Sequence, residues 1–361
     1  MIADHLNVSI ATVSKALGNK SDISEAMRLK VEKAANELGY KYGSASQKRK
    51  PGQAKTSNQF IGVFIRRPLE NGGKNVPTYM DGMSRIAAQS GTSLVVQEWG
   101  YADDPSTLIS KRQQPPALRD GLLSGVALGG EWPAEVINNI SLRHPVVLFP
   151  QSVIGCGVDV VGLDNVATMQ LIISRLKRLG HERIGFLGRC GAMTWASERF
   201  AGYVSAMEQM GLPYNPKWAL DVDEAPMLNE GHEDYWRERM DRVEAARNDD
   251  GVEAWVCSSD WPAFQLYRGM ADRGYEIPKD LSVTGLDDTE PVHLGCRPVT
   301  SVKVPRELIG EAALKRLLYL IENPRSAPRQ SKFACRLMLN GTIGKPTYAN
   351  NTSDDPEGVA A

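Results

Sequence analysis

Apolar residues recur at helical spacing three times near the start of the chain, which predicts three short helices. Residues 2–6 form the first helix, and residues 9–17, with Ser9 as the N-cap, form the second. In residues 24–40, Met27, Val31, Ala34 and Leu38 follow an i, i+4, i+7 stripe that ends at the capping position Gly39. Two short helices across a tight turn, with a third packed on them, are typical of a helix-turn-helix unit.

The second of these helices has an unusually polar surface. Its apolar stripe is thin and consists of Val8, Val13, Ala16 and Leu17. The remaining face is short and mildly cationic and carries Ser9, Ile10, Ala11, Thr12, Ser14 and Lys15. Such a face is suited to contact with another macromolecule rather than to a protein core.

Residues 43–59, GSASQKRKPGQAKTSNQ, contain no Leu, Ile, Val, Met or aromatic residue. The segment is small, polar and basic, and Pro51-Gly52 interrupts it. This composition predicts a linker.

From residue 60 the pattern changes to short apolar runs that alternate with amphipathic segments. Strands are predicted at residues 60–65, 92–97, 125–130, 145–149, 160–164, 183–188, 253–259 and 281–287, and helices at residues 78–90, 166–179, 197–210, 233–247 and 262–273. Continuous apolar strands between helices favour parallel sheets covered on both faces. So many strands over residues 60–344 predict an α/β core of two similar lobes, and residues 345–361 are predicted to be disordered.

Composition adds a charge asymmetry. The chain of 361 residues has 42% hydrophobic residues and a net charge of −1, yet residues 1–58 contain ten Lys or Arg and five Asp or Glu. A basic head on an acidic body suggests that the head meets an anionic polymer, whereas a basic tail without function is the alternative. With no apolar run that could span a membrane, no secretory signal and scattered cysteines, we expect a cytoplasmic protein without disulfides.

Motifs for catalysis or for metal binding are missing from the sequence. The five histidines (5, 144, 181, 232 and 293) have no ligand spacing, and the five cysteines (156, 190, 257, 296 and 335) form no CxxC pair. GxSxG, P-loop and GxGxxG patterns are absent. We therefore expect no cofactor, no metal and no enzymatic activity.

Several motifs together resemble the LacI–GalR (lactose/galactose repressor) family of bacterial transcription regulators. Residues 2–40 are similar to the DNA-binding head of that family, and its core landmarks follow in order: VGLDN (161–165), RLKRLGHERIGFLG (175–188), ERFAGYVSAM (198–207), residues 257–288 and RPVTSVKVPRELIG (297–310). The resemblance covers nearly the whole chain. It implies a homodimer that binds a pseudo-palindromic operator, and a two-lobed core, similar to periplasmic sugar-binding proteins, with a small-molecule effector between the lobes.

The resemblance assigns roles in the head. Helix 9–17 becomes the recognition helix, with Ile10, Ala11 and Lys15 at the positions that read bases. Lys15 can donate to guanine, and Ile10 and Ala11 can contact thymine methyl groups. Ser9, Thr12 and Ser14 suit phosphate oxygens. Burial of Ile10 against the first helix is the alternative for that residue, and Ser9 can cap its helix as well.

This sequence departs from the family pattern in two places. It begins after the polar segment that caps the first helix in relatives, which implies either an upstream start or a head weakened by about 1 kcal/mol. The linker also lacks the Leu that wedges into the minor groove in relatives. We expect Lys48, Arg49 and Lys50 to bind phosphates without a strong kink in the DNA.

The resemblance also assigns effector contacts in the core. Arg199 would donate to hydroxyls or a carboxylate, Asp287 would accept from sugar hydroxyls, and Ser259 stands where many relatives have Asn. Trp195 is either a sugar platform in a loop or a packing residue. Gln151 and Tyr79 are weaker candidates. For Tyr79 the alternative role is burial in the dimer interface.

Three other polar residues of the core are expected to have structural roles rather than to bind the effector. Asp164 is expected to cap a helix, Asp260 to cap the helix that begins at Trp261-Pro262, and Glu198 to hold Arg199.

The sequence thus predicts a transcriptional repressor controlled by a small molecule, with a carbohydrate as the expected effector and a purine or another metabolite still open. Two other classes compete with this interpretation. A solute-binding protein with a vestigial head is disfavoured by the intact third helix, and a Rossmann-type enzyme is disfavoured by the missing phosphate loop.

Overall fold

A computed structural model describes residues 2–6, 8–17, 23, 24, 27, 30, 31, 34, 59–67, 76–100, 102–150, 152–223, 232–289 and 297–347. The chain divides into two compact units, the head (Met1–Ser57) and the core (Asn58–Ala361). The linker 43–59 lies outside the described residues except for Gln59, the first residue of the first core strand.

The head contains the predicted helices wherever it is described. Helix α1 spans Ile2–Leu6 and α2 spans Ile10–Leu17, and residues 27, 30, 31 and 34 are helical as well. Ile2, Val13, Ala16, Val31 and Ala34 form its buried cluster. The apolar stripes of the three segments therefore meet in one small core, whereas Leu38 and Gly39 lie outside the described residues.

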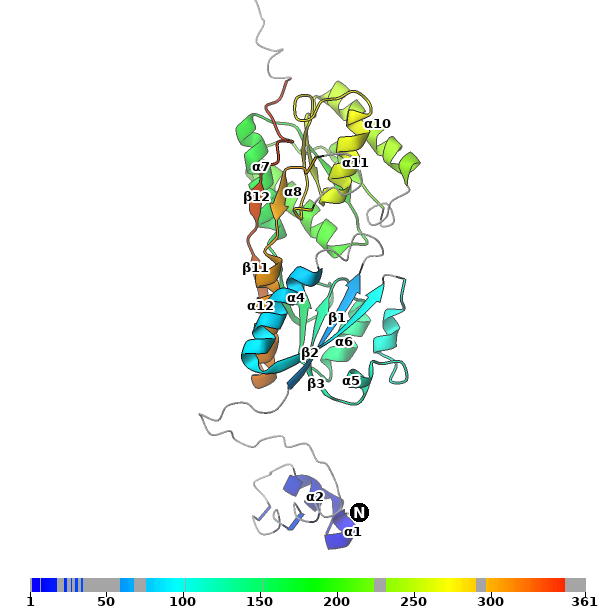
Figure 1. Ribbon diagram of the computed structural model, residues 1–361, viewed down its shortest axis with the longest axis vertical. Helices are drawn as coiled ribbons and strands as arrows, with labels where there is room; N and C mark the ends of the chain where they lie inside the picture. Colours follow the sequence, from blue (N-terminus) through cyan, green and yellow to red (C-terminus); the bar gives the residue numbers. More distant parts are fainter. Residues whose placement is uncertain are drawn as a thin grey trace, which may run out of the picture. The chain divides into compact units, whose positions relative to one another are not determined.

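The first lobe of the core, lobe 1, is built on a six-stranded sheet with the order β11-β5-β4-β3-β1-β2. Its strands are β1 (Gln59–Arg67), β2 (Thr92–Gly100), β3 (Leu123–Gly129), β4 (Val146–Phe149), β5 (Asp159–Leu163) and β11 (Gln330–Phe333), and all its pairs are parallel. The helices that cover it are α4 (Val76–Ser90), α5 (Pro116–Arg119), α6 (Ala134–Ser141) and α12 (Arg306–Glu322) (Figure 1).

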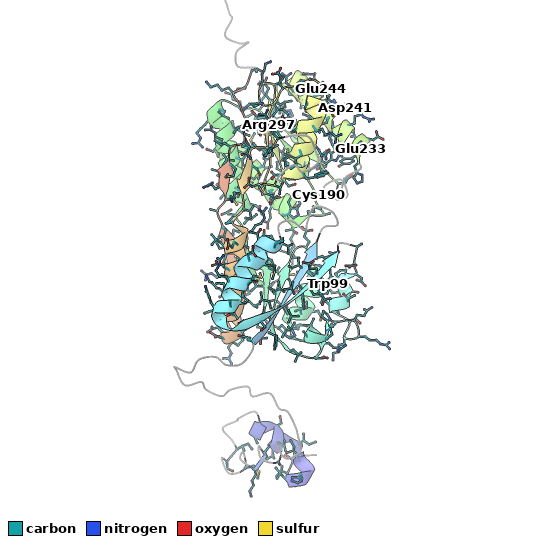
Figure 2. The ribbon with its side chains drawn as sticks, in the orientation of Figure 1. Trp99, Cys190, Glu233, Asp241, Glu244 and Arg297 are labelled. Atoms are coloured by element: carbon teal, nitrogen blue, oxygen red, sulfur yellow. The ribbon has the colours of Figure 1, made fainter. Side chains whose placement is uncertain are left out.

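Both faces of this sheet are covered by apolar side chains. Ile61, Val63 and Ile65 of β1 pack in the cluster that contains residues of α4 and α12. Phe64 packs on the opposite side with Trp99 and Trp132 at ring-centroid distances of 5.4 Å (Phe64–Trp99) and 5.2 Å (Trp99–Trp132). Trp99 is labelled in lobe 1 in Figure 2. Burial on both faces explains why the strand is a continuous apolar run.

Lobe 2 repeats this plan with four parallel strands in the order β7-β6-β8-β9. The strands are β6 (Ile184–Arg189), β7 (Ala219–Asp221), β8 (Ala254–Cys257) and β9 (Ser282–Thr284), and the helices are α7 (Asn165–Leu179), α8 (Thr194–Gln209), α10 (Glu233–Asp250) and α11 (Asp260–Ala271). The order of its strands matches β2-β1-β3-β4 of lobe 1. The two lobes therefore share one topology.

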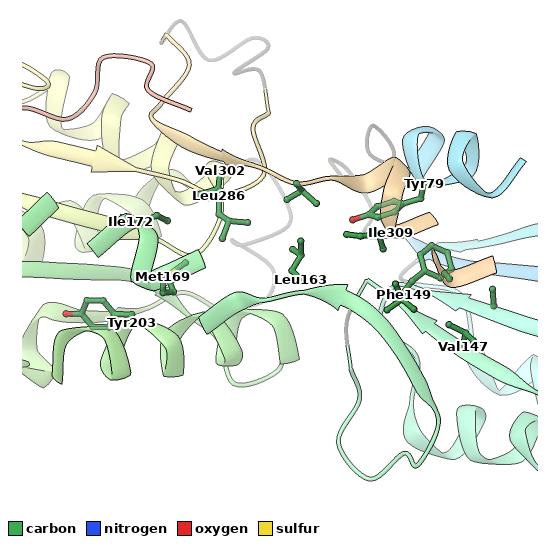
Figure 3. Close-up of a cluster of buried hydrophobic side chains, with 14 of the residues drawn as sticks. Tyr79, Val147, Phe149, Leu163, Met169, Ile172, Tyr203, Leu286, Val302 and Ile309 are labelled. Carbon is green, nitrogen blue, oxygen red and sulfur yellow. The ribbon is translucent and has the colours of Figure 1, made fainter. Parts of the chain in front are cut away.

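Within the described ranges the chain passes between the lobes at three places: between β5 and α7, between β10 (Ser301–Lys303) and α12, and between β11 and β12 (Arg336–Met338). A single buried cluster continues along these segments, with Leu163 and Ile309 near the junction and Met169 and Leu286 in lobe 2 (Figure 3). Strands β10 and β12 pair antiparallel beside it.

The predicted strands and the parallel α/β class are confirmed, and Asp164 caps α7 by accepting from the backbone N–H of Ala167 at 3.0 Å. The pattern missed β7, β10, β11, β12, α5, α6 and α12. Helix α8 begins at Thr194, before the predicted start at residue 197. Residues 345–347, predicted to be disordered, belong to the core, since Thr347 bonds to Glu253 through its backbone N–H at 2.5 Å. No helix of the described ranges is long and apolar enough to cross a membrane.

Helices α4 and α12 cross at two glycines. A Cβ atom at Gly82 would lie 2.0 Å from the carbonyl oxygen of Glu307, and one at Gly310 would lie 2.1 Å from that of Tyr79. Arg85 of α4 also pairs with Glu307 and Glu311 of α12. The close contact fixes the start of α12, which lies beside the junction.

We expect Gly82→Ala to lower the free energy of unfolding by about 1–3 kcal/mol or more, because the obstacle is backbone rather than a mobile side chain. Urea unfolding of the whole chain measures this loss. Gly157→Ala is the control, since nothing lies within 4 Å of a Cβ there. Equal stability of the two variants would contradict the close crossing.

Candidate functional site

The exposed face of α2 carries the side chains that the sequence assigns to DNA contact. Ile10 is 80% exposed, and Ala11, Ser14 and Lys15 are exposed too. Val13 and Ala16 face the core of the head instead. The alternative that Ile10 is buried against α1 is therefore wrong.

Ser9 caps α2 as predicted. Its Oγ accepts a hydrogen bond from the backbone N–H of Thr12 at 3.0 Å and lies 2.8 Å from the Thr12 hydroxyl. Because Ser9 stays exposed at the helix start, a phosphate contact is compatible with the cap. Lys48, Arg49 and Lys50 lie outside the described residues.

In the core, Arg199 of α8 occupies the junction of the lobes and is 5% exposed. Its Nη1 donates to the carbonyl oxygen of Ser258 at 2.6 Å, and its Nε donates to Oδ1 of Asn165 at 3.2 Å. Its Nη2 lies 3.4 Å from Oδ1 of Asp287. The guanidinium group predicted to hold an effector is thus engaged with three segments of the protein.

The sequence suggested that Glu198 holds Arg199 directly, but the two side chains are linked through Asn165. Oε2 of Glu198 accepts from the side-chain amide of Asn165 at 2.7 Å, and Asn165 in turn accepts from Arg199. Oε1 of Glu198 accepts from the hydroxyl of Ser152 at 2.7 Å. Ser152 follows β4 of lobe 1, so this carboxylate links the lobes. The sequence missed it because the partners are distant along the chain.

Two further hydrogen bonds join the lobes. Arg306, the first residue of α12, donates from Nη2 to the carbonyl oxygen of Asp287 at 2.7 Å and lies 3.8 Å from Oδ1 of that residue. The backbone N–H of Thr194 donates to Oε1 of Glu131 at 3.2 Å. Asp287 therefore lies between the guanidinium groups of Arg199 and Arg306.

The backbone of the Asp287 loop is strained. Asp287 has φ of 120° and Asp288 has φ of 54°, values that L-residues other than glycine seldom adopt. Such a conformation costs of order 1–3 kcal/mol per residue and persists only where neighbouring groups hold it.

The other predicted effector residues have mixed surroundings. Trp195 lies in the first turn of α8, not in a loop, and the Arg199 guanidinium sits over its ring at 4.7 Å. Ser259 is 8% exposed and precedes α11. Tyr79 is buried, and burial raises its pKa to about 12 although Arg306 opposes the shift. Gln151 lies outside the described residues.

Asp260 is not the helix cap predicted from the sequence. It is the first residue of α11, and its carboxylate turns to Ser301 (2.6 Å) and Thr289 (2.7 Å to the backbone nitrogen). The pKa of Asp260 is raised to about 6, because burial and then the charge of Asp287 raise it more than the hydrogen bonds from Ser301 and Thr289 lower it.

A pocket of about 550 Å³ opens at the carboxyl ends of β6 and β7. Its lining includes Cys190, Ser197, Phe200 and the paired Arg189 and Asp221. Of these residues, Cys190 is labelled in Figure 2. Among the described residues, no group of three or more His, Cys, Asp or Glu side chains could hold a metal ion.

Comparisons with known proteins agree with this architecture. Residues 2–42 match the model of bacterial regulatory proteins of the lacI family, and residues 173–343 match the periplasmic binding protein-like domain. The chain is 24% identical over 349 residues to the HTH-type transcriptional repressor CytR of Escherichia coli (strain K12), which covers 94% of each chain.

Two solved structures have the same fold. The transcriptional regulator CelR in complex with cellobiose is 22% identical, with a TM-score of 0.63 over 95% of this chain and 98% of that chain. The lac repressor dimer bound to operator and the anti-inducer ONPF is 20% identical, with a TM-score of 0.62 over the same shares. The chain is therefore similar to lacI-family regulators in both its head and its core.

Sequence reasoning missed Ser152, Arg306 and the role of Asp260. Arg306 lies in the motif 297–310. That motif identified the segment but did not show that Arg306 bonds to Asp287. The hydrogen bonds that Ser152 and Arg306 make between the lobes form only when folding brings the carboxyl ends of strands from both sheets together.

The difference in unfolding free energy between the wild type and Asp260→Asn should depend on pH. The carboxyl of Asp260 loses its proton near pH 3.9 in the unfolded chain and near pH 6 in the folded one, so the folded state holds more protons between these values. The stability that this group contributes is complete below about pH 4, and about 2–3 kcal/mol is lost as the pH rises through 6.

Urea unfolding of both proteins at a series of pH values between about 4 and 7 measures this difference. The subtraction removes the other carboxyl groups, which titrate in both proteins. A difference that stays constant over this range would contradict the raised pKa.

Proposed function

We propose that the protein is a homodimeric transcriptional repressor of the cytoplasm, without enzymatic activity, that binds a pseudo-palindromic operator under the control of a small-molecule effector. Residues 1–42 bind DNA, residues 43–59 connect, and residues 60–344 bind the effector and dimerise. The observation that carries the proposal is the capped, outward-facing surface of α2 on a chain whose core matches the lacI-family fold.

The surface of α2 supports base readout. Ile10 and Ala11 are exposed apolar groups at the helix start, and apolar groups discriminate thymine by its methyl group. Lys15, one turn further, supplies a cation for guanine O6 and N7. Ser9, Thr12 and Ser14, with Lys48, Arg49 and Lys50 of the linker, contact phosphates, which fix the position but not the sequence.

The junction of the lobes is the effector site, and the effector is a carbohydrate. Asp287 already neutralises part of the charge of Arg199 and Arg306, so a neutral ligand that donates and accepts fits better than an ion. Sugar hydroxyls do both, and they can replace the 3.4 Å contact between Arg199 and Asp287. The cellobiose complex of CelR, which has this fold, supports the class.

Four other side chains complete the proposed site: Ser259, Trp195, Gln151 and Tyr79. Ser259 supplies a hydroxyl beside the Ser258 carbonyl that Arg199 uses. One face of Trp195 holds Arg199, so a sugar ring stacks on its other face. Because Ser152, Glu131 and Arg306 join the lobes directly, an effector shifts the balance between lobe arrangements and thereby the operator affinity.

Gel-shift titration with DNA upstream of the protein's own operon tests the first half of the proposal. We expect Lys15→Ala to cost about 1–3 kcal/mol of operator binding and to reduce the preference for operator over unrelated DNA, because a base contact is lost. Lys30→Ala removes the same charge from the head outside α2, and we expect it to weaken both DNAs alike. An unchanged preference in Lys15→Ala would refute the assignment of α2.

A thermal-shift screen tests the second half, with cellobiose, maltose, ribose and lactose compared with adenine and cytidine. We expect at least one sugar to raise Tm and to change operator affinity. Ser259→Ala should weaken that response by about 1 kcal/mol, or roughly fivefold in apparent Kd, since one hydrogen bond is lost. Ser205→Ala is the control, because its hydroxyl bonds to Gln209 on the same helix. Stabilisation by adenine or cytidine, with no effect of any of the four sugars, would contradict a carbohydrate effector.

A further inference from the structure

The carboxylate of Asp260 is almost fully buried, with 1% of the residue exposed. Neither the DNA surface nor the proposed effector contacts use it. A buried carboxylate is costly unless hydrogen bonds compensate it, so its partners indicate what it holds in place.

All the side-chain partners of Asp260 belong to, or hold, the segment around Asp287. Its Oδ2 accepts from the backbone N–H of Thr289 at 2.7 Å and from the Thr289 hydroxyl at 2.9 Å. Its Oδ1 accepts from the hydroxyl of Ser301 at 2.6 Å. The oxygen of that hydroxyl in turn accepts from the backbone N–H of Asp288 at 3.0 Å.

The backbone brings the same two segments together. The N–H of Asp260 donates to the carbonyl oxygen of Leu286 at 2.9 Å. A Cβ atom at Gly285 would lie 2.1 Å from Oδ1 of Asp260, so the carboxylate reaches this position only beside a glycine. The segment 285–289 is therefore fixed from both ends against the start of α11.

This segment needs an external restraint because Asp287 and Asp288 have positive φ. Such a backbone conformation persists only where surrounding groups hold it, and several hydrogen bonds to a charged group can do so. This backbone conformation brings Asp287 to the two arginines of the junction. Nη2 of Arg199 lies 3.4 Å and Nη2 of Arg306 lies 3.8 Å from Oδ1 of Asp287.

We propose that Asp260 is the positioning residue for Asp287: its carboxylate holds residues 286–289 in the strained conformation that carries Asp287 to Arg199 and Arg306. Three donors converge on it, and a carboxylate has acceptors on both oxygens, whereas an asparagine has one acceptor oxygen and presents N–H groups to the others. The inference deepens the proposed function, because Asp287 contacts an effector only if that proposal holds.

The test uses no effector, so it can fail independently of the proposed function. Arg199 lies over the ring of Trp195 at 4.7 Å and bonds to Asp287, so Trp195 reports where Asp287 holds Arg199. The full chain is labelled with 5-fluorotryptophan, and its ¹⁹F resonance for Trp195 is the one missing in Trp195→Phe.

We expect Asp260→Asn to shift the Trp195 resonance, because Asp287 leaves Arg199 when its loop relaxes. Asp287→Asn should produce a similar shift, and the double variant should add little to it, since both changes break one chain of contacts. Asp272→Asn, at the C-cap of the same helix, is the matched control. Its side chain is 74% exposed and lies 4.0 Å from Arg268, and the Trp195 resonance should stay in place.

Thr289→Ala is the second variant, and it decides the matter if Asp260→Asn does not fold. It removes one hydroxyl donor and keeps the backbone N–H, so we expect a smaller shift in the same direction. If Asp260→Asn lowers Tm but leaves the Trp195 resonance unchanged, Asp260 has only a general structural role and the proposal is overturned. If Asp260→Asn does not fold, the same result in Thr289→Ala overturns the proposal. An additive shift in the double variant would overturn it as well.

Discussion

The core depends on the hydrogen bonding of one buried guanidinium group. Arg199 is 5% exposed, and a buried charge is tolerated only where it is paired and its donors are used. Its partners come from the start of α7, from the end of β8 and from the loop after β9. Because these three segments must converge on one group, Arg199 fixes how the carboxyl edge of the lobe 2 sheet is arranged.

The same group ties that edge to lobe 1. Asp287, which contacts Arg199, also accepts a hydrogen bond from Arg306 at the start of α12. Asn165, the second partner of Arg199, donates to Glu198, which accepts from Ser152 after β4. The close crossing of α4 and α12 fixes Arg306 in turn. A ligand that competes for Arg199 or Asp287 therefore acts on lobe 1 and lobe 2 together, which is the physical requirement for a two-state regulator.

Much of the fold followed from local patterns. The eight apolar runs are strands because both faces of each sheet are covered, and Asp164 and Ser9 cap helices because their short side chains reach the first free backbone N–H groups. The pattern was weakest for short elements such as β7 and β10, and for α12, whose motif was recognised but not its helix. Those segments take their structure from neighbours rather than from their own periodicity.

The sequence by itself determined the order of the elements, the apolar and outward faces of α2, and the residue types at the carboxyl ends of the strands. These properties depend on contacts within one or two turns, so periodicity and capping rules reveal them. Only the tertiary structure decided that Asp260 turns away from its own helix and that Arg199 is already paired. Their partners are 29 to 88 positions distant in sequence, and the balance between a local cap and a distant hydrogen bond depends on what folding brings near.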